Sequence, residues 1–286
     1  MALLETALNN IRDVAAVPSF SSYEERLHPY INRIAEEIPR LKQVDAPGNN
    51  LIYMIPGDGA TGSSAVALSA HLDKINHYGR DHPGKLPVEV GEDFIEGAMD
   101  DSAGVGIILS LMQHSDQFRF PTLYIFFSEM EEKKGLKEHP ELLRNGGQGL
   151  YSGLGAERIA DTCLEQKLIP KLVVTVDTTP LFEGDPGVAL YSRHWELNEI
   201  EPEEAEREET QEVVERFQAI DPNLELANNT NDYMHYGRLF NHDTGHTVPS
   251  VALEPAIYPY HQKGERVYIR DIKRVLQILT NFLEDR

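Results

Sequence analysis

Short apolar segments, each of a length suited to one β-strand, constrain the fold of this chain most strongly. There are five of them: 51–55, 65–70, 122–127, 171–176 and 248–253. Helical patterns surround them over 2–16, 22–38, 102–114, 141–145, 157–166 and 267–286. This alternation favours parallel strands, because each connection must cross back over the sheet. The sequence therefore predicts an α/β fold of three layers, with a mostly parallel central sheet and helices on both faces.

The length fits one large domain. The 286 residues are 41% hydrophobic, and no internal repeat or low-complexity linker divides them. The most biased segment, 195–218, is rich in glutamate and indicates a solvated helix that starts near Pro202 and turns Val213, Val214 and Phe217 to the core. We expect a single domain over 1–286.

Charge and composition exclude several classes of partner. A net charge of −21 repels phosphate backbones and anionic lipids, so we expect neither nucleic acid nor a membrane as partner. Apolar runs of about six to eight residues fall short of the roughly 20 that a membrane helix needs. The N-terminus carries Glu5 and no secretory pattern. Cys163 is the one cysteine, which fits a reducing cytoplasm. The sequence predicts no particular oligomeric state.

Histidine and acidic residues follow the predicted strands at the point where each strand ends. They are His71 and Asp73, then Glu129, Glu131 and Glu132, then Asp177, with Asp100 and Asp101 at the start of the apolar helix. In open α/β sheets the functional groups gather beyond the carboxyl ends of the strands. Imidazole and carboxylate ligands without thiolate suit zinc, manganese or cobalt, and this many could hold two ions about 3.5 to 4 Å apart.

The order of these motifs resembles a known family. HLD, then GAMDDSAG, then EE, then a strand-end Asp and a late His is similar to the co-catalytic zinc exopeptidases, which include leucyl aminopeptidases, peptidase T and the carboxypeptidase G branch. The resemblance runs from about residue 20 to the C-terminus. It implies metal ligands at His71, Asp100, Glu132, Asp177 and a late histidine, with Asp100 bridging two ions, Glu132 on the second ion and Asp177 completing the first.

Three histidines lie where the family places its last ligand. YHQKGERVYIRDI resembles the closing motif of the family, so we assign His261, with His242 and His246 as alternatives. The resemblance also implies a cis peptide bond between Asp100 and Asp101. We expect Asp101 in addition to cap the helix that follows.

The expected chemistry assigns catalytic roles to Glu131 and Asp73. Residues two apart on an extended segment share a face, so Asp73 is expected to accept the N–H of His71 and orient its ring. Two divalent ions among three carboxylates favour a bridging hydroxide, and Glu131 as general base would pass its proton to the leaving amine. The sequence departs from the family pattern once, so the resemblance does not predict the shape of the next loop. Lys133 and Lys134 both stand between EE and Gly135, where one residue is usual.

We therefore expect a two-metal hydrolase of peptides or small amides, and most specifically an aminopeptidase. The 26 residues between Asp73 and Asp100 and the 83 between Asp177 and His261 leave little room for a separate lid or dimerisation domain. The alternatives are a carboxypeptidase, a di- or tripeptidase, another amidohydrolase, a one-metal acyl-transfer enzyme, or a non-catalytic binding relative of the fold.

The sequence offers groups for either end of a peptide. An α-ammonium needs a carboxylate, and the candidates are Glu196, Asp232 and Asp243. A substrate carboxylate needs a cation, best an arginine, and the candidates are Arg193 and Arg238. Tyr233, Tyr236 and Phe240 are expected to line an apolar pocket.

Overall fold

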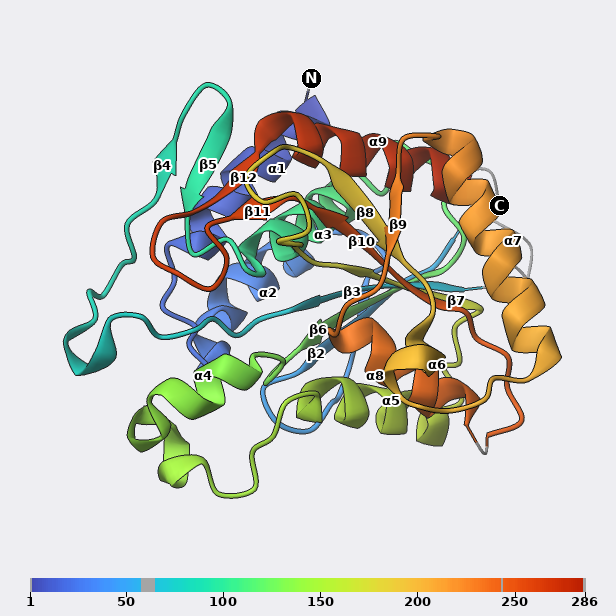
Figure 1. Cartoon of the computed structure of the whole chain (residues 1–286), viewed down its shortest axis with the longest axis horizontal. Helices are drawn as coiled ribbons and strands as arrows, with labels where there is room; N and C mark the ends of the chain where they lie inside the picture. Colours follow the sequence, from blue (N-terminus) through green and yellow to red (C-terminus); the bar gives the residue numbers. More distant parts are fainter. Residues whose placement is uncertain (1, 58–64, 243, 285–286) are drawn as a thin grey trace.

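A central sheet of eight strands organises the computed structural model, which describes residues 2–57, 65–242 and 244–284 (Figure 1). In spatial order the strands are β1 (Lys42–Val44), β2 (Leu51–Ile55), β6 (Leu123–Ser128), β3 (Val66–His71), β7 (Leu172–Val176), β10 (Ser250–Pro255), β8 (Val188–Tyr191) and β9 (Glu225–Ala227). The neighbours β6, β3, β7 and β10 run parallel, as do β8 and β9. Antiparallel pairs occur nearer the two edges, where β1 meets β2, β2 meets β6, and β10 meets β8.

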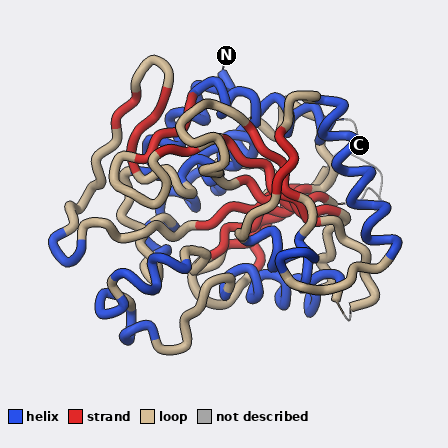
Figure 2. Tube along the Cα trace, viewed as in Figure 1, coloured by secondary structure: helices blue, strands red, loops and turns tan. Residues whose placement is uncertain are grey.

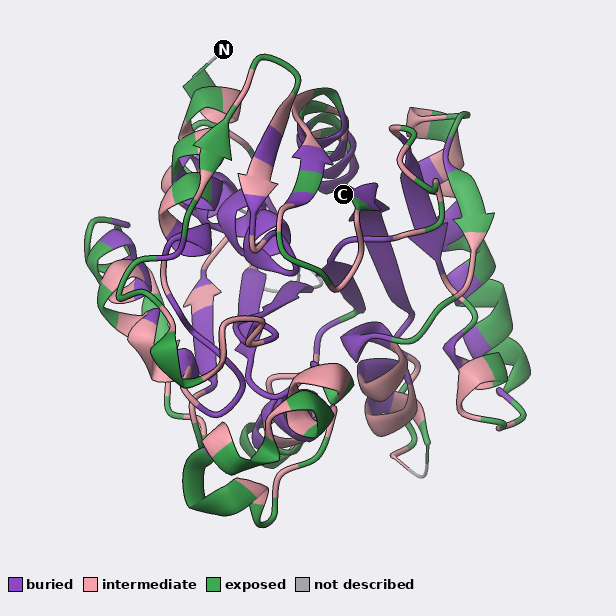
Figure 3. Ribbon diagram, turned by 60° about the vertical axis from the view of Figure 1, so that its left-hand side comes forward, coloured by how far each residue is buried: buried purple, intermediate pink, exposed green. Residues whose placement is uncertain are grey.

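Helices cover both faces of this sheet, and the predicted α/β fold is confirmed (Figures 1 and 2). One face carries α1 (Ala2–Ala15), α2 (His28–Glu36), α3 (Ser102–Gln113) and α9 (Ile269–Glu284), and the other carries α5 (Leu154–Gln166) and α8 (Asp232–Asn241). The helix α7 (Glu204–Ile220) packs on α9 and exposes its outer side (Figure 3). It buries Val213, Val214 and Phe217, as the sequence predicts.

A smaller sheet stands beside the main one. Its order is β11 (Ile257–Tyr258), β12 (Glu265–Tyr268), β5 (Phe94–Gly97) and β4 (Glu89–Val90). The short helices are α4 (Lys133–Glu138) and α6 (His194–Leu197), with 3₁₀ turns η1 (Glu24–Arg26), η2 (Gly79–Asp81), η3 (Pro140–Leu142) and η4 (Arg144–Gly147). Among the described residues no helix is long and apolar enough to cross a membrane.

The apolar helix α3 lies between the sheet and α1, buried along nearly its whole length (Figure 3). Two glycines permit this packing. A methyl group on Gly104 would collide with the carbonyl oxygen of Val176, and one on Gly106 with Ile11 of α1. Close backbone approach of this kind needs glycine. The packing places the start of α3 directly beside the end of β7.

Several predicted boundaries are wrong. The helix predicted over 22–38 is divided into η1 and α2, because Pro29 lies in the first turn of α2 and starts a new helix there. The segment 141–145 forms 3₁₀ turns, and β10 begins at Ser250, two residues after the predicted start. The strands β1, β8 and β9, the helix α8 and the smaller sheet were not predicted. Each of those strands has only two to four residues, too few to show a period.

Candidate metal centre

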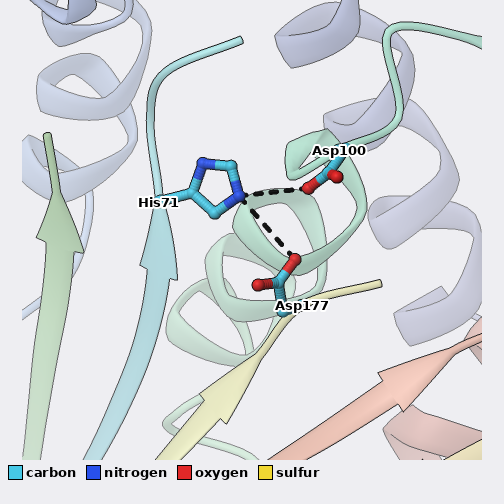
Figure 4. A group of neighbouring side chains, drawn as sticks. All are labelled: His71, Asp100 and Asp177. Atoms are coloured by element: carbon cyan, nitrogen blue, oxygen red, sulfur yellow. Dashed lines mark hydrogen bonds and ion pairs between the residues drawn. The ribbon is translucent and has the colours of Figure 1, made fainter. Parts of the chain in front are cut away.

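The first group of candidate ligands lies where β3 and β7 end. His71 is the last residue of β3, Asp177 follows β7, and Asp100 precedes α3. Figure 4 shows the His71 ring pointing at both carboxylates. Its Nε2 lies 3.1 Å from Oδ1 of Asp100 and 3.7 Å from Oδ1 of Asp177. The three buried side chains are close enough together to hold one metal ion.

A second group shares Asp100 with the first. Nε2 of His261 lies 3.3 Å from Oδ2 of Asp100 and 3.3 Å from Oε2 of Glu132. Glu132 stands directly before α4, and His261 lies in the turn after β11. These three side chains could also hold one ion. Because the two oxygens of Asp100 face different groups, the structure brings all five predicted ligands into one cluster with that aspartate between its halves.

The two alternative histidines lie elsewhere. His242 is the residue after α8, and His246 is in the loop before β10; both are exposed. That loop leads into the amino end of β10, whereas the cluster occupies the carboxyl ends of the neighbouring parallel strands. Of the three histidines considered from the sequence, the structure places only His261 in a metal-binding group among the described residues.

Asp73 contacts His71, but mainly in a different way from the one predicted. Nδ1 of His71 lies 3.1 Å from the backbone carbonyl oxygen of Asp73 and 3.4 Å from its carboxylate. The strand ends at His71, so the two side chains do not follow a regular extended spacing. The carboxylate instead accepts hydrogen bonds from Ser21 Oγ at 2.8 Å and from the backbone N–H groups of Glu131 and Glu132 at 2.9 and 3.2 Å. Asp73 thereby holds the backbone that carries the EE pair.

The turn before α3 has the features that the sequence predicts. The peptide bond between Asp100 and Asp101 is cis. The Asp101 carboxylate accepts the N–H of Gly104 at 2.7 Å and so caps α3. Sequence reasoning missed the partner of this turn, Glu265, whose carboxylate accepts the N–H groups of Met99 and Asp100 at 2.9 and 3.2 Å. The available signal was an acid four residues after His261, at the first position of the short segment ERVY that forms β12.

The electrostatics of the cluster suit divalent cations. Burial raises the pKa of Glu132 well above its usual range, and the charges of Asp100 and Glu131 add to the effect. Burial likewise raises the pKa of Glu131 and of Asp177, with further contributions from neighbouring carboxylates. Oε1 of Glu132 is buried without a hydrogen-bond partner among the described residues. Buried carboxylates at this density need compensating positive charge, and their oxygens together with two imidazoles form a donor set that fits such ions.

Two further buried acids adjoin the cluster. Asp232, at the start of α8, accepts the hydroxyl of Ser128 through Oδ2, while its Oδ1 has no hydrogen-bond partner among the described atoms. Burial raises the pKa of Asp232 to about 7. Glu254, near the end of β10, accepts a hydrogen bond from Asn231. The sequence singled out Asp232 but not Glu254, although Glu254 directly follows the apolar run 248–253.

The other groups proposed for substrate binding differ from expectation. Glu196 is exposed and lies 3.0 Å from Arg193, so these two candidates pair with each other. Arg238 is partly buried on α8, and Asp243 lies outside the described residues. The predicted apolar pocket is wrong: three aromatic side chains are fully buried in the core, where they pack against the sheet and its helices, namely Tyr233, Tyr236 and Phe240.

Residues 50–267 match the model of peptidase family M28. The chain belongs to this family. The match spans most of the chain and includes all the candidate ligands, which confirms the resemblance to co-catalytic zinc exopeptidases. As an M28 member, the chain is a metal-dependent exopeptidase. No curated protein matches the sequence significantly.

Solved structures share the fold at low sequence identity. An aminopeptidase from the archaeon Desulfurococcus kamchatkensis has 12% identity and a TM-score of 0.67, over 99% of this chain and 96% of that one. The TET1 peptidase of Pyrococcus horikoshii has 13% identity and a TM-score of 0.65, over 98% and 100%. A tripeptidase from Staphylococcus aureus has 11% identity and a TM-score of 0.65, over 99% and 98%. At these identities the likeness establishes the fold alone.

Proposed function

We propose that this M28 peptidase is an aminopeptidase that works with two divalent ions, most suitably zinc. His71 and Asp177 would hold one ion, Glu132 and His261 the other, and Asp100 both. The support is geometric, since each oxygen of Asp100 faces a different histidine. When bound, such ions polarise the substrate carbonyl and lower the pKa of an attacking water.

Glu131 is the general base in this proposal. Its carboxylate takes a proton from the attacking water and delivers it to the nitrogen of the leaving amine. The backbone of Glu131 is fixed on both sides: its N–H donates to Asp73, and its carbonyl accepts the hydroxyl of Ser152 at 2.6 Å. A base held in this way keeps its position through the reaction.

Charge favours the amino terminus of the substrate, and this observation carries the proposal. The carboxylates at or beside the centre include these six: Asp73, Asp100, Glu131, Glu132, Asp177 and Asp232. Their six formal negative charges exceed the four positive charges of two divalent ions. The remaining negative charge attracts an α-ammonium and repels a terminal carboxylate. The nearby carboxylate with an unpartnered oxygen, Asp232, is the best placed of the described candidates for that ammonium group.

One tripeptide in three forms tests this proposal: free, N-acetylated and C-amidated. We expect hydrolysis of the free and amidated forms and loss of activity on the acetylated form. Cleavage of the acetylated form with loss on amidation would support the carboxypeptidase or tripeptidase alternative. Hydrolysis of none of the three by metal-loaded protein would favour a different amide substrate or a non-catalytic relative.

We also propose a cytoplasmic location and one catalytic domain over 1–286 without a separate lid. The location is supported by the single cysteine, Cys163, which is buried and free. Nucleic acid stays an unexpected partner, because the charge of −21 repels it.

A further inference from the structure

We propose that Lys134 is a positioning residue that holds His261 for the metal ion it would share with Glu132. The inference rests on the proposed function, because it assumes that these two side chains are ligands. Lys134 touches neither imidazole nor carboxylate of that pair. It acts on the backbone of the turn that presents His261.

The turn that carries His261 needs support from outside. His261 lies between β11 and β12 with a left-handed φ of 54°, and its side chain is 20% exposed, against 2% for His71. No strand ladder fixes it, in contrast to His71, which pairs with Ser128 of β6. Two side chains secure its backbone. The Glu265 carboxylate accepts the N–H of His261, and Nζ of Lys134 donates to its carbonyl oxygen at 2.8 Å.

Lys134 connects the two ligands of the second group through their backbones. It stands two residues after Glu132, at the start of α4. Its Nζ also lies 3.3 Å from Oε1 of Glu138, one helical turn later. The lysine therefore ties the turn of His261 to the short helix that follows Glu132. His71 and Asp177 need no such connection, since His71 is the last residue of β3 and Asp177 directly follows β7 in the central sheet.

The spacing of the chain restricts Lys134. Lys133 and Lys134 are the two residues between the EE pair and Gly135. Gly135 packs closely on Ser21, where a side chain would collide with the hydroxyl. With Glu132 held at one end and Gly135 at the other, the position of Lys134 is restricted. Lys133 is exposed and has no interaction among the described residues, which makes it a matched control.

Replacing Lys134 should change the metal affinity in opposite directions for the two roles that the lysine could have, a positioning role and a purely electrostatic one. Removing a lysine near a cation site removes a repulsive charge and so tightens cation binding. Losing the tether instead lets His261 leave the ligand geometry and weakens binding. Changes around metal ligands typically cost 10- to 100-fold in affinity. Because Lys134 acts through the backbone, we expect about tenfold, the lower end of that range.

The experiment is a Co²⁺ titration of the metal-free protein, followed by visible absorption and calorimetry. The variant Glu132→Ala identifies which binding step belongs to the second group. Lys134→Met should weaken that step about tenfold and leave the other step unchanged. Lys134→Arg should restore most of the affinity, since arginine can donate to the same carbonyl. Lys133→Met should show no weakening.

Unchanged or tighter binding at that step in Lys134→Met would overturn the inference. Equal weakening of both steps, together with a lower melting temperature of the metal-free variant, would do the same, because it would indicate a general structural role. If wild-type protein binds no Co²⁺, or if Glu132→Ala loses no binding step, the proposed function itself fails and the inference fails with it.

Discussion

The candidate centre has two halves that are built differently. His71 and Asp177, which we term the strand-end half, lie at the carboxyl ends of parallel strands of the central sheet: His71 is the last residue of β3 and Asp177 directly follows β7. Glu132 and His261, the loop half, lie on irregular chain next to short elements. Both halves meet at Asp100. A sheet positions its strand ends through its own backbone ladder, whereas a loop ligand needs separate side-chain tethers.

The tethers of the loop half come from distant parts of the chain. Asp73 accepts the N–H groups of Glu131 and Glu132, and Ser21 of the N-terminal segment donates to the same aspartate. Glu265 links the turn at Asp100 to the turn of His261 through three backbone N–H groups. These contacts give irregular chain the fixed geometry that hydrogen bonds between strands give the other half.

The largest expected effect follows from replacing the shared residue. Asp100→Ala should lose both ions and all measurable activity, because each half loses one of its three candidate side chains and the two ions lose their common carboxylate. Elemental analysis after metal loading and desalting measures this, with wild type expected to carry close to two equivalents. Retention of one full equivalent would contradict this expectation, since it would mean that the two halves bind their ions independently.

A smaller effect separates base from ligand within the EE pair. Glu131→Ala should keep both ions and lose roughly 10²- to 10⁴-fold in turnover, the usual contribution of general base catalysis. Glu132→Ala should instead lose the ion of the loop half. Steady-state kinetics and metal content together distinguish the two. The opposite pattern would show that the roles of the two glutamates are exchanged.

The smallest expected effect comes from an ion pair outside both halves, whose loss should lower the stability of the fold without changing metal binding. Arg274 on α9 pairs with Asp221 at the end of α7, and this hydrogen bonding holds the pKa of Asp221 below its ordinary value. A lowered folded-state pKa contributes stability above the unfolded-state value of about 4, and that contribution is lost as pH falls through the folded value.

Asp221→Asn should therefore lower the free energy of unfolding by up to about 1 kcal/mol near pH 7 and have little effect at a pH below the lowered folded-state pKa. Urea unfolding at the two pH values measures the difference. Metal content should equal that of wild type. A change in metal content would show that the α7–α9 contact reaches the centre and is not an independent reference.

Sequence reasoning predicted the strand-end half more directly than the loop half. His71 and Asp177 stand after apolar runs whose ends are visible in the sequence, so the sheet rule places them together. His261 was assigned through the resemblance to a closing motif, with two other histidines left open. The structure brings the five ligand candidates together, but their roles stay predictions until metal binding is measured.

The tethers could not be predicted, because they are tertiary contacts without a local pattern. Lys134 and His261 are 127 residues apart in sequence, and Ser21 and Asp73 are 52 apart. The hydroxyl of Ser21 reaches Asp73 from the segment between α1 and α2. The fold shows the same division: long periodic elements such as α3 and α9 were found, while strands of two to four residues carry too little periodicity to detect.

The contact of Ser21 with Asp73 affects which fragments of this protein can be expressed as folded units. The family match begins at residue 50 and ends at 267, so it excludes α1, α2 and α9. Those helices fill one face of the central sheet, and the segment before α2 supplies the hydroxyl that holds Asp73. A fragment limited to 50–267 would expose that apolar face to water and release one partner of the catalytic turn. The segment that the family model matches is therefore shorter than the segment needed to cover both faces of the central sheet.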